Sequence, residues 1–337
     1  RAGTLDLKGG FGSTLASFIS ISGGASVGIY GPLVHFGGTI SAFIRKLSFV
    51  PKIPHDIIIG SGVAAAISAG FGAPLAGIIF AHEIVLRHFS MKAITALAVA
   101  SMAANFSASE INLVNSSLLL TPVTFKFSDI IGSISLIGPI AAVVAIIFMR
   151  TMIYLGTIPK KINIKLWQAP IIAGICCGLF GLLFDEVLGI GTDTLMLIIT
   201  SEQSYQYLLL LLVGKLLLTS ICIGFGFFGG TYSPALFLGA IVGALVFQLP
   251  FINLNPDLLA ILAVCGMAAV SSSVIGAPIT SIILVLELTG SYEYAIAATF
   301  PIVICSFITS RLFGNSLFDK QLTSRGVQIT KGREQFY

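Results

Sequence analysis

Two eleven-residue stretches decide the fold of this 337-residue chain: residues 28–38, GIYGPLVHFGG, and residues 230–240, GTYSPALFLGA. Both contain Gly-x-Tyr-x-Pro followed by an apolar run, and they lie 202 residues apart. Glycine allows two backbone segments to approach closely, and proline suits the first turn of a helix, where its missing N–H is not needed. Each stretch therefore predicts that one helical segment is interrupted and that a new helix starts there.

A second pair of stretches repeats in the same order. Residues 72–83 read GAPLAGIIFAHE and residues 276–287 read GAPITSIILVLE, 204 residues apart. Chance similarity between apolar segments would not preserve both the order of two motifs and their spacing. The sequence therefore predicts an internal duplication.

The composition indicates a membrane protein. The chain has 18 Lys and Arg and 14 Asp and Glu, so only 9% of its residues are charged, while 56% are hydrophobic. A soluble chain is about one quarter charged. These values exclude a soluble enzyme, a nucleic-acid binder and a disordered chain, and they favour an all-α polytopic membrane protein. A spanning helix of about 20 residues with its short connection takes about 28 residues, so there is room for roughly a dozen membrane segments.

We expect a single membrane domain over residues 1–337. Its first half covers about residues 1–150 and its second about 166–315, and a short C-terminal tail follows over 316–337. The chain opens at Arg1 without an initiator methionine, directly ahead of a Gly-rich apolar segment. We therefore expect that an N-terminal part of the protein is missing here.

The paired breaks point to an anion site. The first turn of a helix presents free N–H groups and about half a positive charge, so it attracts an anion without any charged side chain. A repeated pair of interrupted helices at matching positions indicates a substrate site near the membrane midplane of a transporter. Inverted halves bring the two helix starts together from opposite faces, and parallel halves from the same face. Inversion is the usual arrangement, although these residues alone do not decide it.

Two polar side chains within apolar surroundings each allow two interpretations. Lys215, in LLVGKLLL, is either a functional cation inside the membrane or a side chain that reaches to the interface. Tyr292 lies near the end of the last repeated helix. Its hydroxyl either donates to an anion or belongs to an ordinary interfacial aromatic residue. The five cysteines have no paired metal-binding spacing, so no metal site is predicted.

At the paired motifs the chain resembles the CLC family of chloride channels and chloride/proton antiporters. Residues 28–32, GIYGP, stand where the family has Gly-Arg-Glu-Gly-Pro, and residues 230–234, GTYSP, stand where it has Gly-Ile-Phe-Ala-Pro. The stretches at 72–83 and 276–287 fit its two Ala-Pro helices, and residues 189–192 fit its Gly-rich break. The likeness is collinear over nearly the whole chain. The family motif Gly-Ser-Gly-Ile-Pro is absent and would precede the first residue.

The resemblance implies a CLC-type inverted repeat of tilted and broken helices, in a homodimer with one pore per subunit. It implies an integral, multi-pass protein of the cell membrane, without an enzymatic activity or a cofactor, that carries chloride or a similar small anion. Many eukaryotic members of the family carry a cytoplasmic CBS-domain pair after the membrane part. This chain ends soon after Arg311, so we expect that it either lacks that pair or was cut before it. The implied anion ligands are backbone amides and one hydroxyl, at Ile29, Tyr30, Gly31, Thr231, Tyr232 and Tyr292.

The chain departs from the family pattern at both proton-coupling carboxylates. Tyr30 stands at the position of the gating glutamate, and a phenol with a pKa near 10 is uncharged at neutral pH. The second proton-transfer carboxylate falls, without gaps, at Ile84. We therefore expect passive anion transport with little or no proton coupling, slowed by the Tyr30 ring if it obstructs the path.

Glu83 is the nearest substitute for the inner carboxylate. Because its counterpart in the second half is Glu287, a structural role such as capping explains it as well as a proton pathway does. His35 and His82 have no metal partner at usable spacing, and we interpret both as packing residues.

Three alternatives remain beside passive transport. The first is a proton-coupled antiporter that uses Glu83, and the second is a non-conducting partner or sensor subunit. The third, an intramembrane enzyme, is disfavoured because the adjacent His82 and Glu83 point to different faces of a helix.

Overall fold

The computed structural model describes residues 7–46, 53–111, 118, 125–250, 255–314, 316–324 and 326. Over these residues the protein is helical, and its only β-pairing is one isolated bridge. The helices in chain order are α1 (Leu7–Ser22), α2 (Tyr30–Ile44), α3 (His55–Phe71), α4 (Pro74–Phe80), α5 (Met91–Glu110), α6 (Phe127–Lys161), α7 (Gln168–Leu183), α8 (Thr192–Thr200), α9 (Tyr205–Gly224), α10 (Tyr232–Phe247), α11 (Leu259–Ile275), α12 (Pro278–Thr289), α13 (Tyr292–Leu312) and α14 (Leu317–Ser324). A π-helical turn, Ala81–Leu86, continues α4, and 3₁₀ turns cover Asp185–Val187 and Pro256–Leu258.

The helices fall into two length classes. Among the described residues, five helical segments are long and apolar enough to cross a membrane, and five shorter apolar helices have 10 to 17 residues. Short apolar helices are typical of membrane proteins whose helices stop inside the bilayer, where the freed backbone groups must be buried in protein or line a cavity. The expectation of an all-α polytopic membrane protein with broken helices is confirmed.

The duplication is visible in the element order. Helices α3 and α11 each have 17 residues and start 204 positions apart, and each ends at a glycine with a left-handed backbone, Gly72 with φ 66° and Gly276 with φ 82°. In both halves a proline then starts the next helix, at Pro74 and Pro278. Glycine takes this conformation without steric penalty, which explains the Gly-Ala-Pro motif at each turn.

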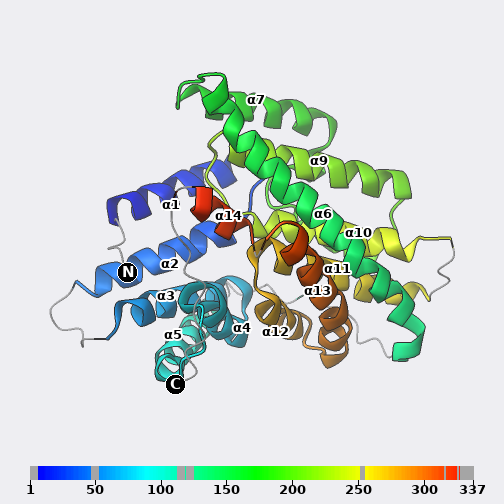
Figure 1. Ribbon diagram of the computed structural model, residues 1–337, viewed down its shortest axis with the longest axis horizontal. Helices are drawn as coiled ribbons and strands as arrows, with labels where there is room; N and C mark the ends of the chain where they lie inside the picture. The colour runs from blue at the N-terminus through cyan, green and yellow to red at the C-terminus, as the bar shows by residue number, and fades with distance from the viewer. Residues whose placement is uncertain are drawn as a thin grey trace.

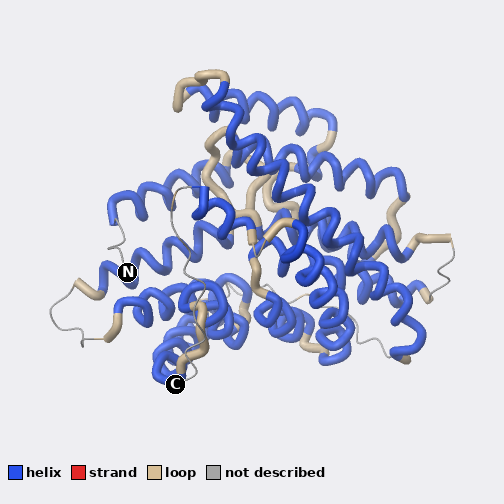
Figure 2. Tube along the Cα trace, viewed as in Figure 1, coloured by secondary structure: helices blue, strands red, loops and turns tan. Residues whose placement is uncertain are grey.

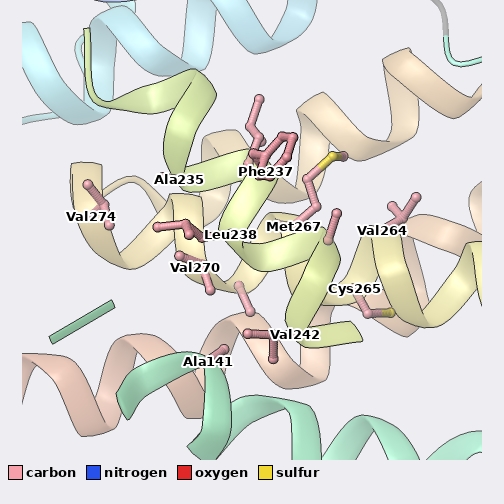
Figure 3. Packing of buried hydrophobic residues seen from close by; sticks show 14 of the residues in the cluster. Ala141, Ala235, Phe237, Leu238, Val242, Val264, Cys265, Met267, Val270 and Val274 are labelled. Carbon is pink, nitrogen blue, oxygen red and sulfur yellow. The ribbon is translucent and has the colours of Figure 1, made fainter. Parts of the chain in front are cut away.

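The core of the described part of the chain is formed around α10 and α11 (Figure 3). A Cβ atom built on Gly239 would collide with the backbone of Gly266 and Met267, so the two helices pack with their backbones almost in contact. The longest helix, α6, lies against this pair. The clustered side chains shown in Figure 3 include Ala141, Ala235, Phe237, Leu238, Val242, Val264, Cys265, Met267, Val270 and Val274.

Helices α2 and α10 leave the centre of the molecule in opposite directions (Figure 1). The loops that precede them gather at the same central region (Figure 2). The fold thus brings the starts of the two equivalent helices to one place.

Candidate functional site

The two segments that precede α2 and α10 are hydrogen-bonded to each other directly. Gly28 N–H donates to the carbonyl oxygen of Gly230 at 2.7 Å, and Gly230 N–H donates to the carbonyl oxygen of Gly28 at 2.6 Å, in an antiparallel bridge. Gly28 and Gly230 are equivalent positions of the two repeats. Two equivalent residues that exchange identical hydrogen bonds are related by a local twofold axis that passes between them. This is the relation expected between inverted halves.

Close approach explains the glycines at this crossing. A Cβ atom on Gly31 would lie 2.9 Å from Gly230 Cα, and one on Gly230 would lie 2.7 Å from the Gly31 nitrogen. Neither residue has a positive φ. These glycines therefore serve the close approach that the sequence suggests, without a left-handed backbone conformation.

Within the described part of the chain, both helices begin with amides that have no backbone hydrogen-bond partner. The first helical hydrogen bond runs from Leu33 N–H to Ile29 C=O at 3.0 Å in α2, and from Ala235 N–H to Thr231 C=O at 3.1 Å in α10. The N–H groups of the preceding helical residues have no partner of this kind, and proline occupies the third helical position in each case. Two positive helix ends therefore meet at one point, without any full charge.

A cavity of about 260 Å³ lies at this point and is lined by both halves of the chain. Its wall includes Tyr30 and Gly31 from the start of α2, and Thr231 and Tyr232 from the start of α10. No Asp, Glu, Lys or Arg is among the described residues that line it, and His35 is the one imidazole. An apolar cavity beneath helix N-termini favours a small anion over a cation.

Three aromatic rings pack together beside the helix starts. The Tyr30 ring stacks on Phe71 with centroids 3.6 Å apart and planes inclined by 10°. Tyr232 meets both rings edge to face, at 5.8 Å from Tyr30 and 5.5 Å from Phe71. Edge-to-face and stacked contacts both stabilise such a cluster, so the Tyr30 ring is held in place at the cavity wall.

Glu83 and Glu287 bind reciprocally to the opposite half. The Glu83 carboxylate accepts the N–H groups of Ile279 at 3.1 Å and Thr280 at 2.8 Å, as well as the Thr280 hydroxyl at 2.7 Å. Glu287 accepts the N–H groups of Leu75 at 2.8 Å and Ala76 at 2.7 Å. Each carboxylate thus caps the helix that begins at the Ala-Pro motif of the other repeat, which is the contact expected of the structural interpretation.

The position at which the resemblance implies an inner proton-transfer carboxylate carries no titratable group. Ile84 follows Glu83 in the π-helical turn Ala81–Leu86 and lines the cavity with its apolar side chain. The cavity wall at this position is therefore unable to exchange a proton.

Lys215 is fully buried, so its interpretation as a side chain reaching the interface is wrong. Its Nζ donates to the carbonyl oxygens of Val187 at 3.1 Å, Leu188 at 3.4 Å and Gly189 at 2.8 Å. The ammonium also lies 5.0 Å from the centroid of the Phe237 ring. These contacts satisfy the buried cation and fix the loop ahead of α8.

The two histidines that sequence analysis interprets as packing residues have different surroundings. His82 is fully buried, stacks on Phe89 at 5.2 Å, and its Nδ1 lies 3.2 Å from the carbonyl oxygen of His88. His35 lines the cavity, and its Nδ1 lies 3.2 Å from the Ser13 hydroxyl on α1.

Tyr292 lies away from the helix starts, in contrast to the expectation. It is 68% exposed and is not among the cavity-lining residues. The physical reason is the length of α12, whose N-terminal Thr280 lines the cavity. Tyr292 follows the far end of this helix, about 18 Å along its axis at 1.5 Å per residue.

Phe318 lines the cavity and is missed by sequence analysis. It belongs to α14, within the segment expected to be a C-terminal tail, and Asp319 beside it pairs with Arg87. The sequence signal for it is weak: Leu317 and Phe318 are two adjacent apolar residues in a segment rich in polar side chains. Most of residues 325–337 of the expected tail lie outside the described residues.

Comparisons with known proteins agree with this architecture. A family model described as voltage gated chloride channel matches residues 1–311. The H(+)/Cl(-) exchange transporter ClcA of Vibrio cholerae serotype O1 (strain M66-2) is 28% identical over 336 residues, which cover 94% of this chain and 69% of the relative. A slow cyanobacterial Cl−/H+ antiporter has a TM-score of 0.76 at 22% identity, covering 91% of this chain and 74% of its own.

A CLC-type fluoride/proton antiporter gives a similar result, with a TM-score of 0.75 at 25% identity, covering 88% of this chain and 72% of its own. These relatives are named as transporters and not as enzymes. Because the family model covers most of the sequence, this multi-pass membrane protein belongs to the voltage gated chloride channel family, the CLC proteins.

Proposed function

We propose that this protein carries chloride or a similar small anion passively across the membrane, through the cavity at the starts of α2 and α10. The observation that carries the proposal is the bridge between Gly28 and Gly230, which holds two helix N-termini at one point. The proposed ligands are the backbone amides at Ile29, Tyr30 and Gly31 in the first half and at Thr231 and Tyr232 in the second. Tyr292 is not retained among them.

Two features support a path without proton coupling. The cavity wall has a phenol at Tyr30 and an isoleucine at position 84, and none of its described residues is a carboxylic acid. An exchanger needs a group that takes up a proton at one stage of its cycle and releases it at another. A phenol remains protonated throughout the physiological pH range, so it does not meet this need.

A flux assay in liposomes tests the proposal. The purified chain is reconstituted with high internal chloride and a potassium ionophore, and both chloride efflux and internal pH are followed. We expect chloride efflux that stops when the ionophore is left out, and no pH change when chloride runs down its gradient. Proton movement against its own gradient, driven by chloride, would overturn the passive mechanism.

Restored carboxylates provide a positive control for coupling. The double variant Tyr30→Glu/Ile84→Glu places titratable groups at both positions where the family has them. We expect this variant to move protons when chloride is driven, under conditions in which the parent chain does not. The single variant Ile84→Glu, which lacks the outer carboxylate, is the matched control and should remain uncoupled.

Proton-coupled exchange through Glu83 is the second candidate, because the similar ClcA of Vibrio cholerae is named an H(+)/Cl(-) exchange transporter. Against it stands the binding of the Glu83 carboxylate by three donors of α12, which holds it as a helix cap. Glu83→Gln separates the two, with Glu287→Gln as the control that removes the equivalent cap. Loss of proton movement in the first variant alone would favour exchange.

We further propose that the chain assembles as a homodimer in the cell membrane. Light scattering of the detergent-solubilised protein tests the stoichiometry, and a strictly monomeric mass would contradict it.

A further inference from the structure

The start of α10 carries a hydroxyl for which the described part of the chain provides no partner. Thr231 is only 7% exposed and lines the cavity, yet its buried Oγ1 has no hydrogen-bond partner. Buried hydroxyls are nearly always paired. The hydroxyls of Ser233 and Thr309 are also unpaired, but of these three residues only Thr231 lines the cavity, where a bound ligand can supply the partner.

The sequence explains why the Thr231 hydroxyl has no hydrogen-bond partner in its own helix. Thr231 occupies the N-cap position of α10, from which a threonine normally accepts the N–H of the second or third helical residue. The third helical residue is Pro234, which has no N–H, and no side-chain cap bond is formed. Rotation about the Cα–Cβ bond exchanges the hydroxyl with the methyl group, so the O–H can turn toward the cavity.

The electrostatic surroundings determine what the hydroxyl can bind. The unpaired first-turn amides of α10 are adjacent, and they make this end of the helix positive. A ligand at this place is therefore a hydrogen-bond acceptor with negative charge, to which Thr231 acts as a donor. The equivalent N-cap residue in the first half is Ile29, so the hydroxyl is a feature of the second half alone.

We propose that the Thr231 hydroxyl donates a hydrogen bond to the bound anion and biases the cavity toward small, charge-dense halides. A hydrogen bond to an ion strengthens as the charge of the ion is concentrated at short distance, so chloride and fluoride gain more from the O–H than iodide or thiocyanate does. This inference deepens the proposed function and rests on anion transport through the same cavity.

Thr231→Val tests the inference, because it keeps the shape of the side chain and removes the hydroxyl. We expect the ratio of chloride to iodide flux in liposomes to fall by about tenfold, and the affinity for chloride measured by calorimetry in detergent to fall by a similar factor. Thr231→Ser retains the hydroxyl and should stay within about twofold of the parent chain. Thr309→Val is the matched control, because Thr309 in α13 is also buried with an unpaired hydroxyl and does not line the cavity.

The outcomes separate this inference from the proposed function. Flux with an unchanged halide ratio in Thr231→Val overturns the role of the hydroxyl and leaves transport intact. Chloride binding that depends on the hydroxyl, together with absent flux in the parent chain, supports the ligand role and overturns transport. Absence of both binding and flux in the parent chain overturns both. If Thr231→Val does not fold, Thr231→Ala provides the same comparison against Thr231→Ser.

Discussion

Helices α2 and α10 begin with the same motif and differ in how far the protein surrounds them. In α10, fifteen of sixteen residues are buried, while in α2 only Gly38, Thr39, Ser41 and Ala42 are. The motif sets where a helix begins and where its amides point, whereas the neighbouring helices determine how rigidly it is held. Equal substitutions in the two repeats should therefore have unequal effects.

The largest effect is expected at the equivalent glycines Gly239 and Gly37. A Cβ atom at either position would collide with a backbone carbonyl, of Gly266 and of Gly62 respectively. Because α10 is enclosed and α2 has an open side, we expect Gly239→Ala to lower the free energy of unfolding by about 3 kcal/mol and Gly37→Ala by about half of that. Thermal unfolding in detergent measures both, and equal losses would break the comparison.

The second-largest loss of stability is expected at the reciprocal carboxylates Glu83 and Glu287. Glu83 has three donors and Glu287 has two, so Glu83→Gln should cost more than Glu287→Gln, at about 2 and 1 kcal/mol. Unfolding measurements on both variants, with the double variant to reveal any coupling, provide the check. A larger loss at Glu287 would mean that the count of hydrogen bonds does not set the stability of these helix ends.

Tyr30→Ala tests the effect of the less enclosed helix, α2, on anion transport. Removal of the ring that stacks on Phe71 should raise anion flux by about tenfold, equivalent to about 1.4 kcal/mol in the barrier. Tyr30→Phe retains the ring and should leave the flux unchanged. Identical flux in Tyr30→Ala and the parent chain would mean that the ring lies outside the anion path.

The smallest effect, with the opposite sign, is expected at Gly38. A Cβ atom there would lie 3.6 Å from Ile59, in ordinary contact, and the equivalent residue in the second half is already Ala240. Gly38→Ala should therefore raise the free energy of unfolding by about 0.5 kcal/mol through the lower entropy of the unfolded chain. A melting temperature below that of the parent chain would contradict this.

Sequence analysis predicts the repeated elements well because each is determined by local chemistry. The Gly-x-Tyr-x-Pro motif fixes the starts of α2 and α10, and the Gly-Ala-Pro motif fixes the turns ahead of α4 and α12. It fails where a contact depends on distance across the fold. Tyr292 is close to the second motif in sequence, but a whole helix separates it from the cavity, and Phe318 reaches the cavity from a short helix with little apolar signal.

The reciprocal binding of Glu83 and Glu287 has a consequence for the origin of the chain. A single repeat contains one carboxylate and one helix start that are too far apart along the same short helix to meet. An ancestral unit of half this length would leave both groups without partners unless two copies faced each other about a twofold axis. Fusion of two such copies would make permanent, within one polypeptide, a contact that had previously joined separate molecules.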